Sequence, residues 1–447
     1  ADALGSYGNG RVATPWMDRL AAGGVRFADA RAHNVVTLPT HASILTGLYP
    51  YEHGVRDNSG FRLSGELPTL ATILQAEGYR TGAFVSAFPL DSRFGLDRGF
   101  EVYEDSFAGS ERRSAFFEQE RAGDRPSALA REWIDADDTR PWFCWLHLYE
   151  PHFPYDPPEP LRSRFRDALY LGDVAVADAA LGAVLAPILD PAVEGQTLVV
   201  LTSDHGEALG EHGEATHGIF AYEGTLRVPL IVHQPELLAP AVVSEPVRHI
   251  DILPTVLDVL ALPIPESIPG RSLLAAAAGE SLAGGYGVYF ESLSPQLNRG
   301  WAPLYGIVDG GMKYIELPVP ELYDLDRDPA EVDNLAAEEP ELLAELRSKL
   351  ASLRAGDRGA LPAPEDAETV ERLRSLGYLT GSAGQKREFT VDDDPKNLIE
   401  LDRAMRDVVT LYGEGDLEAA LERARELVAR RPGMRMALIE LAHLEKE

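Results

Sequence analysis

Runs of apolar residues alternate with helical patterns along the first two thirds of the chain. Continuous apolar runs between turn residues predict strands, because a strand that is buried on both faces shows no polar alternation. Such runs lie at residues 81–87, 141–148, 196–204 and 228–233. Helical spacing of apolar residues predicts helices at 68–77, 168–189 and 250–260. The alternation indicates an α/β fold with a mostly parallel sheet between helices.

The pattern changes after residue 281, which divides the rest of the chain. We assign residues 1–281 to a catalytic core. Residues 282–354 contain shorter strand-like runs and then a helical pattern, which predicts a small α+β subdomain. Residues 355–394 are rich in Gly, Ala, Pro and charge, which predicts a linker with one helical island, AETVERLRSLGYL. Residues 395–447 follow helical spacing almost throughout.

The helical tail, residues 395–447, carries turn and contact residues at regular positions. Gly415 predicts a turn between helices, Ala420 a close helix contact and Pro432 a helix stop. The tail resembles one tetratricopeptide repeat, with a period of about 34 residues, and the start of another. Such repeats stack and bind proteins, so we expect further repeats and a protein partner. An ordinary helical hairpin packed on the catalytic core is the alternative.

Acidic residues outnumber basic residues strongly enough to limit the partners. The chain has 41 Lys and Arg against 72 Asp and Glu, a net charge of −31, which excludes nucleic acid. A small anionic substrate would need a local positive centre such as a metal ion. The single cysteine, Cys144, excludes an internal disulfide.

The sequence leaves membrane association and location open. We expect no run that is long and apolar enough to span a membrane. The chain starts abruptly at Ala1, so an N-terminal segment could be missing. Such a segment would be consistent with an extracytoplasmic or membrane-anchored location.

Two short segments combine residues that suit metal-assisted catalysis. Thr37 precedes an apolar, helix-like run that starts at Pro39, and unpaired backbone N–H groups at a helix N-terminus attract anions. Asp204 and His205 come at the end of an apolar run, where a strand meets a loop. An Asp oxygen beside a His nitrogen suits Mn²⁺ or Zn²⁺. For Asp-His-Gly alone, a capped turn is the alternative interpretation.

A longer series of motifs connects these residues. It comprises GSYGNGRVATPWMDRLAAGGVRFADARAHNVVTLPTHASILTGLYPYEHGVRDN, EGYRTGAF, HLYEPHFPYDPPEP, TSDHGEALGEHG, YEGTLRVPLIV, HIDILPTVLDVL, PGRSLL and ELYDLDRDPAEVDNLA. With these motifs, the chain from Ala1 to about Leu353 resembles the sulfatase family of the alkaline phosphatase superfamily. The resemblance implies an alkaline-phosphatase-like fold, hydrolysis of small anionic esters, and a divalent metal on Thr37, Asp204 and His205. Mn²⁺ or Zn²⁺ is favoured, with Ca²⁺ or Mg²⁺ as alternatives, and a further carboxylate would lie upstream of Ala1.

The departures from the family pattern change the expected chemistry. Sulfatases place a cysteine or serine, converted to formylglycine, where this chain has Thr37, and an arginine where it has His41. The lysine and histidine that hold the sulfate correspond to Ser86 and Phe88, and a second lysine corresponds approximately to His217. This set resembles the threonine-nucleophile branches of the superfamily. Those branches include phosphodiesterases, phosphonate hydrolases and phosphoethanolamine transferases.

The resemblance and simple chemistry together assign roles to the candidate residues. Thr37 is the expected nucleophile, because a divalent ion lowers the pKa of a bound hydroxyl. His152, in YEPHFPY, and His217 are expected to bind the oxygens of the transferred group and to protonate the leaving group. A second metal ion on these two histidines is the alternative. His41 lies one helical turn after Thr37 and is expected to orient the site.

Three functions follow from these residues. The first is a metal-dependent hydrolase of phosphate or sulfate esters with a threonine nucleophile, for which phosphodiesters and phosphonate monoesters are favoured. The second is a phosphoethanolamine-type transferase, in which an acceptor alcohol replaces water. The third is a repeat-based binding protein with a decayed catalytic domain. The joint presence of Thr37, His152, Asp204, His205 and His217 argues against the third.

Overall fold

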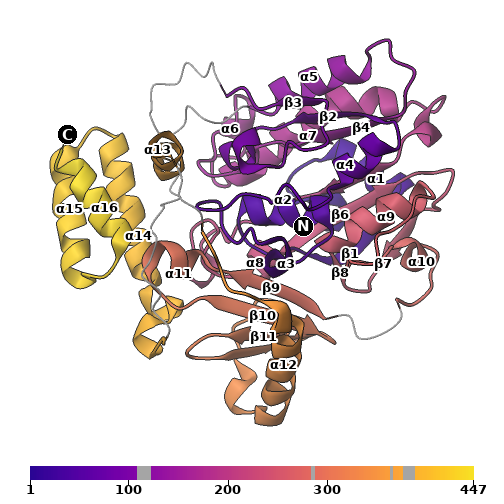
Figure 1. The fold of residues 1–447 in the computed structure, drawn as a ribbon. Helices are drawn as coiled ribbons and strands as arrows, with labels where there is room; N and C mark the ends of the chain where they lie inside the picture. Colours follow the sequence, from indigo (N-terminus) through magenta and orange to yellow (C-terminus); the bar gives the residue numbers. More distant parts are fainter. Residues whose placement is uncertain (108–121, 283–286, 363–365, 376–387, 447) are drawn as a thin grey trace.

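The protein combines a large α/β part, a small antiparallel sheet and a helical tail (Figure 1). The computed structural model describes residues 1–107, 122–282, 287–362, 366–375 and 388–446. The tail packs on one flank of the α/β part. The small sheet lies below the α/β part in the view of Figure 1. The predicted order of an α/β core, an α+β subdomain and a helical tail is confirmed.

A five-stranded sheet forms the centre of the α/β part. Its order is β5–β6–β1–β7, and β8 also pairs with β1. The strands are β1 (Val25–Arg31), β5 (Val199–Thr202), β6 (Arg227–His233), β7 (Ala241–Val243) and β8 (Val247–Arg248). β7 and β8 run parallel to β1, whereas β6 runs antiparallel to both β1 and β5. The sheet is therefore mixed rather than mostly parallel, because the chain returns from β5 to β6 without a long crossover helix.

A second sheet has three parallel strands in the order β3–β2–β4. They are β2 (Arg80–Phe84), β3 (Val102–Glu104) and β4 (Trp142–Leu146). α4 (Leu70–Ala76) and α5 (Asp124–Ile134) pack on β2. The two sheets turn their edge strands, β4 and β5, toward one shared cavity.

This cavity, which we call the strand slot, has a volume of about 620 Å³. Apolar side chains of α1 (Pro15–Gly23), α2 (Thr37–Thr46), α4, α7 (Leu169–Ile188) and α9 (Ile252–Val259) line it. β4 and β5 also line it, and their residues are only partly buried although their sequences are those of core strands. The slot therefore lies where one further strand would fit between β4 and β5, and its apolar lining suits such a strand.

α7 contradicts the expectation that no segment is long and apolar enough to span a membrane. It is the one helix, among the described residues, that is long and apolar enough to cross a membrane, with a mean hydropathy of 1.7. Half of its apolar window is buried inside the fold. The helix packs against α1 and α5 and also lines the strand slot. Its apolar character therefore has a structural explanation within the core.

The small sheet is antiparallel, with the order β12–β11–β10–β9. Its strands are β9 (Val288–Ser292), β10 (Leu304–Asp309), β11 (Met312–Glu316) and β12 (Glu321–Asp324). α12 (Pro340–Leu353) packs on β10 and β11. Further short helices among the described residues are α3 (Pro50–His53), α6 (Leu161–Arg164), α8 (Glu223–Leu226), α10 (Leu274–Ala277) and α11 (Ser294–Arg299).

The segment predicted as a linker is attached to the rest of the fold at several points. Asp357 accepts a hydrogen bond from Arg56 Nη1 at 2.9 Å. Leu373, in α13 (Ala367–Ser375), is fully buried in a core cluster. The remainder of the predicted helical island lies outside the described residues.

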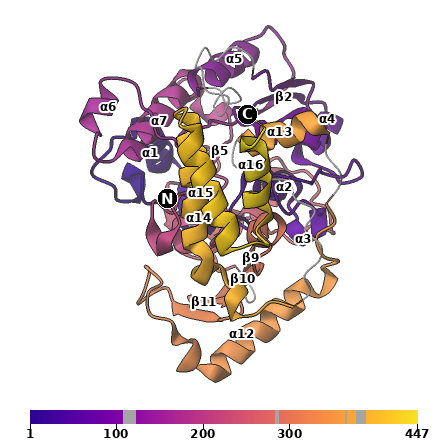
Figure 2. The same cartoon turned by 90° about the vertical axis from the view of Figure 1, so that its left-hand side faces the viewer.

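The tail consists of α14 (Pro395–Gly413), α15 (Leu417–Arg430) and α16 (Arg435–Leu444), side by side in Figure 2. Gly415 has a φ of +85° in the turn between α14 and α15, a conformation that favours glycine. Ala420 is fully buried, and Pro432 follows the end of α15. These features agree with the predicted helical hairpin, and its assignment as a tetratricopeptide repeat stays a prediction.

Candidate active site

Thr37 is the first residue of α2 and is almost fully buried. The preceding Val36 is extended, and Pro39 lies in the first helical turn, where proline interrupts no intrahelical hydrogen bond. Thr37 lines the strand slot, and Asp204 and His205 line the same cavity. The structure therefore brings the three predicted metal ligands to one cavity.

The backbone amides on either side of Thr37 already have partners. The Oδ1 atom of Asn34 accepts a hydrogen bond from the Val36 N–H at 3.2 Å. The Oδ1 atom of Asn58 accepts one from the Leu38 N–H at 2.7 Å. The expectation that these amides would be available to an anion is therefore wrong for both. Instead, the two asparagines hold the start of α2 in place.

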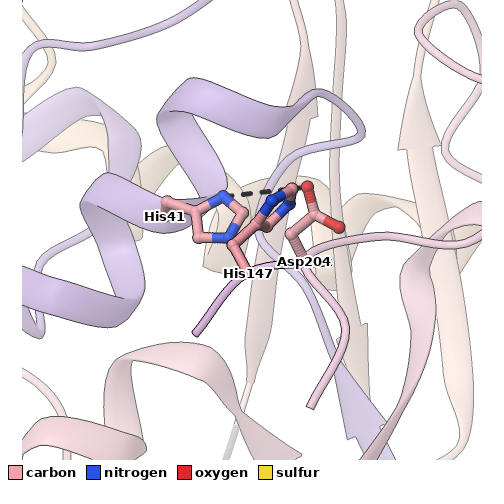
Figure 3. Close-up of side chains that lie close together, drawn as sticks. All are labelled: His41, His147 and Asp204. Carbon is pink, nitrogen blue, oxygen red and sulfur yellow. Dashed lines mark ion pairs between the residues drawn. The ribbon is translucent and has the colours of Figure 1, made fainter. Parts of the chain in front are cut away.

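Asp204 lies among three histidine rings. The Oδ2 atom of Asp204 is 3.7 Å from His41 Nδ1 and 3.4 Å from His205 Nε2. Figure 3 shows the rings of His41 and His147 beside the carboxylate, and ligand atoms of these three residues lie within 4.8 Å of one another. Burial alone would raise the pKa of Asp204, but the histidines His205, His41 and His147 outweigh it and lower the pKa below its usual value. Asp204 is therefore ionised.

The ring of His205 contacts the adjacent backbone on one side and faces Asp204 on the other. Its Nδ1 lies 3.0 Å from the carbonyl oxygen of Gly206, which makes Nδ1 the donor of the ring. Its Nε2 is buried and has no hydrogen-bond partner among the described residues. Burial lowers the pKa of His205, so the ring is neutral and Nε2 has a free lone pair. A neutral imidazole beside an ionised carboxylate fits a divalent ion.

His147 belongs to this group although the sequence interpretation did not include it. It follows the last residue of β4, and its Nδ1 lies 3.4 Å from the Ser86 amide nitrogen. Burial lowers the pKa of His147 to about 3, so the ring is neutral. The signal that could have identified it is a polar residue at the end of an apolar strand. The same signal identified Asp204.

His152 and His217 form a second group beside the first. The Nδ1 atom of His217 lies 2.8 Å from Glu207 Oε1, and Tyr155 donates its hydroxyl to Glu207 Oε2 at 2.8 Å. The ring centroids of His152 and His217 are 5.1 Å apart, and His217 is 4.2 Å from the ring of His205. The two predicted histidines therefore lie together and next to the predicted metal ligands.

The charges in this second group differ between the two histidines. Burial, together with the neighbouring His217, lowers the pKa of His152 to about 4. Burial also acts on His217, but Glu207 outweighs it and raises its pKa, while His217 lowers the pKa of the buried Glu207 to about 2. His217 and Glu207 therefore form an imidazolium–carboxylate pair.

Ligand atoms of His152, Glu207 and His217 also lie within 4.8 Å of one another, so a second cation is an alternative occupant. Glu207 was not identified from the sequence, although it comes two residues after His205 in DHGE.

Ser86 and Phe88 bring no charge to the site. Ser86 is fully buried and donates its hydroxyl to the His147 carbonyl oxygen at 2.7 Å. Phe88 is fully buried and packs edge-to-face against Phe94, with ring centroids 5.6 Å apart. Both positions therefore serve packing and backbone support.

Comparison with known proteins assigns the chain to a family. The sulfatase family model matches residues 1–262, more than half of the chain. The chain belongs to the sulfatase family. A model of the C-terminal part of N-sulphoglucosamine sulphohydrolase matches residues 210–356. Membership of the sulfatase family makes the chain an ester hydrolase, and it gives no support to a decayed catalytic domain. Members of this family are metal-dependent.

Two curated sulfatases show how far the similarity extends. Arylsulfatase K of Xenopus laevis is 24% identical over 425 residues, which cover 77% of this chain and 78% of that protein. Arylsulfatase A of Homo sapiens is 25% identical over 447 residues, which cover 84% of each chain. The similarity therefore includes most of the length of both sulfatases.

Solved structures confirm the fold. The phosphonate monoester hydrolase of Agrobacterium radiobacter superposes with a TM-score of 0.66 at 22% identity, covering 79% of this chain and 93% of that chain. A structure in complex with its substrate D-glucosamine-2-N,6-O-disulfate has the same TM-score and identity, covering 82% and 97%. The fold of this chain is therefore shared by a phosphonate monoester hydrolase and by a protein solved with a disulfated glucosamine as its substrate.

Proposed function

We propose that this sulfatase-family chain hydrolyses singly charged phosphoryl esters, namely phosphodiesters or phosphonate monoesters, through a covalent intermediate on Thr37. The observation that carries the proposal is the position of Thr37 at the start of α2, on the wall of the cavity that Asp204 and His205 share. The resemblance to sulfatases implies a formylglycine at this position, and threonine cannot become that aldehyde. A hydroxyl is then the group that attacks.

The residues around Thr37 fit a divalent ion. Thr37, Asp204 and His205 would hold it, and the bound ion would supply the Lewis acidity that makes a hydroxyl nucleophilic at neutral pH. The ionised Asp204 and the neutral His205 are in the states that bind a cation. Nitrogen and oxygen donors together favour Mn²⁺ or Zn²⁺ over Ca²⁺ or Mg²⁺.

The second group of residues would complete the reaction. In the first step, Thr37 Oγ loses its proton to solvent and bonds to phosphorus, and the bond from phosphorus to the leaving oxygen breaks. The imidazolium of His217, held by Glu207, gives its proton to that oxygen. In the second step, water attacks phosphorus, the bond to Thr37 Oγ breaks, and Oγ takes one proton of the water. His217 regains its proton from solvent, and the neutral His152 contacts the oxygens of the transferred group.

The charge of the ester supports the choice of substrate. A phosphodiester or a phosphonate monoester carries one negative charge and needs less compensation than a doubly charged phosphate monoester. Ser86 and Phe88 stand where sulfatases hold the sulfate with cationic residues, and both are uncharged. The net charge of −31 adds a general repulsion of dianions.

A comparison of four esters tests this proposal. We would measure kcat/KM for an aryl phosphonate monoester, an aryl phosphodiester, an aryl phosphate monoester and an aryl sulfate, all with the same phenol as leaving group. The singly charged phosphoryl esters are expected to rank first. A higher kcat/KM for the sulfate than for every phosphoryl ester would overturn the proposal.

A further inference from the structure

The active-site loop, residues 204–218, starts at the proposed metal ligands Asp204 and His205. It reaches its tip at Gly213 and returns to His217, the proposed proton donor. The backbone N–H of Ala208 donates to the Thr216 carbonyl oxygen at 2.7 Å and closes the loop behind the site. The tip is therefore connected to His217 by a short, hydrogen-bonded segment.

α14 of the tail contacts the tip of this loop. Arg403 donates its Nε–H to the Gly213 carbonyl oxygen at 3.1 Å, and Arg406 donates an Nη1–H to Thr216 Oγ1 at 3.3 Å. A Cβ atom on Gly213 would lie only 3.2 Å from the Cγ2 atom of Ile399, so α14 packs directly against the turn. The tail therefore touches the loop immediately before His217.

Arg406 is itself held in place by a buried carboxylate. Its Nη2 lies 2.6 Å from Oδ2 of Asp402, and Arg299 of α11 donates its Nε–H to Oδ1 of Asp402 at 2.9 Å. Asp402 is only 2% exposed. A continuous series of polar contacts therefore connects the small subdomain, through the tail, with the active-site loop. Its members are Arg299, Asp402, Arg406 and Thr216.

The tail lies outside the part of the chain that the family models describe. The sulfatase model ends at residue 262 and the C-terminal model at residue 356, whereas both include the loop tip at Gly213. Figure 2 shows α14 to α16 along one flank of the α/β part. The contact of α14 with the loop is thus an addition to the matched sulfatase regions.

We propose that the helical tail positions the active site, with Arg403 and Arg406 as positioning residues that hold the active-site loop and so set the place of His217. The inference rests on the proposed role of His217 in turnover. Release of α14 from the loop would lower turnover while every proposed ligand of the ion stays in the chain. A displacement of about 1 Å at a catalytic group is enough to cost on the order of a hundredfold in rate.

The test uses the full 447-residue chain with Arg403→Ala and Arg406→Ala combined. With an aryl phosphonate monoester as substrate, kcat is expected to fall by about tenfold or more, and KM to change less, because Asp204 and His205 are untouched. Arg423→Ala is the matched control, since Arg423 pairs within the tail with Asp407 and Glu426. Arg406→Lys, which keeps a donor toward Thr216, is expected to recover part of kcat when compared with Arg406→Ala.

Hydrogen–deuterium exchange supplies a second readout that does not need turnover. Peptides that cover residues 206–218 should exchange faster in the double variant and as in the parent chain in Arg423→Ala. If the parent chain hydrolyses no ester, the proposed function fails, and exchange still tests the positioning. Unchanged exchange of the loop, with kcat within about twofold of the parent where turnover is measurable, would overturn the inference.

One further variant covers the case in which the double variant also loses the docking of α14. Thr216→Val removes the hydroxyl acceptor from the loop side and leaves α14 intact. It is expected to lower kcat and to raise the exchange of residues 206–218 while α14 stays protected. Parent-like values for both would overturn the inference.

Discussion

The Nδ1 atom of His41 lies 3.7 Å from the Oδ2 atom of Asp204. The same ring nitrogen lies 2.9 Å from the carbonyl oxygen of Thr37, one helical turn before it. One buried ring therefore connects the start of α2, which carries the proposed nucleophile, with the loop after β5, which carries the proposed metal ligands. This position fits the orienting role that the spacing of Thr37 and His41 predicts.

Removal of the ion should stop turnover. We expect a chelator to abolish activity and added Mn²⁺ or Zn²⁺ to restore it, because Asp204 and His205 then recover their cation. The ion should also raise Tm, since a ligand that binds the native state stabilises it. Asp204→Asn should lose both effects, whereas His443→Gln, on α16, should keep them. An equal rise of Tm in Asp204→Asn would show that the ion binds elsewhere.

Thr37→Ala should lower kcat/KM by more than about 10³-fold, because no hydroxyl remains to form the intermediate. Thr37→Ser should retain part of the activity, since it keeps the hydroxyl and loses a methyl group. Tm measured alongside kcat/KM separates the loss of a nucleophile from the loss of the fold. An alanine variant with the activity of the parent would remove the covalent mechanism.

The strand slot predicts how the affinity for the ion depends on a further strand. β4 ends just before His147 and β5 just before Asp204, so a strand parallel to both would also end beside these two residues. In a longer form of the protein that places a strand there, a carboxylate at its end would add a ligand. Calorimetry should then find affinity for Mn²⁺ or Zn²⁺ at least about tenfold higher than for residues 1–447. Equal affinities would show that the slot contributes nothing to the metal site.

Phe88 should affect stability rather than substrate choice. Phe88→Ala is expected to cost about 3–5 kcal/mol of unfolding free energy, because the ring is fully buried against Phe94. Phe153→Ala is the matched control, since that ring is 47% exposed, and should cost about 0.5 kcal/mol or less. Denaturant unfolding measures both changes. A Phe88→Ala variant of parent stability with altered turnover of aryl sulfate would place this residue in the substrate site instead.

The features that the sequence predicted depend on local signals. The apolar run at 228–233 became β6 (Arg227–His233), and the apolar helical pattern at 168–189 became α7 (Leu169–Ile188). Thr37 and Asp204 were identified because a helix start and a strand end are visible within a few residues. Burial and hydrogen bonding between near neighbours determine such features, so the order of residues is sufficient to indicate them.

Other features depend on which parts of the chain meet, and only the tertiary structure decided them. The apolar sequence of β6 is the same whether it runs parallel or antiparallel to β1, so its direction was not predictable from it. His147 joined the site because β4 ends beside Asp204, and Arg403 reached Gly213 across 190 residues of sequence. The partly buried edges of β4 and β5 likewise show a slot that their apolar sequences alone do not. The hydrophobic pattern indicates that a face is buried, whereas long-range packing determines which element of the chain covers that face.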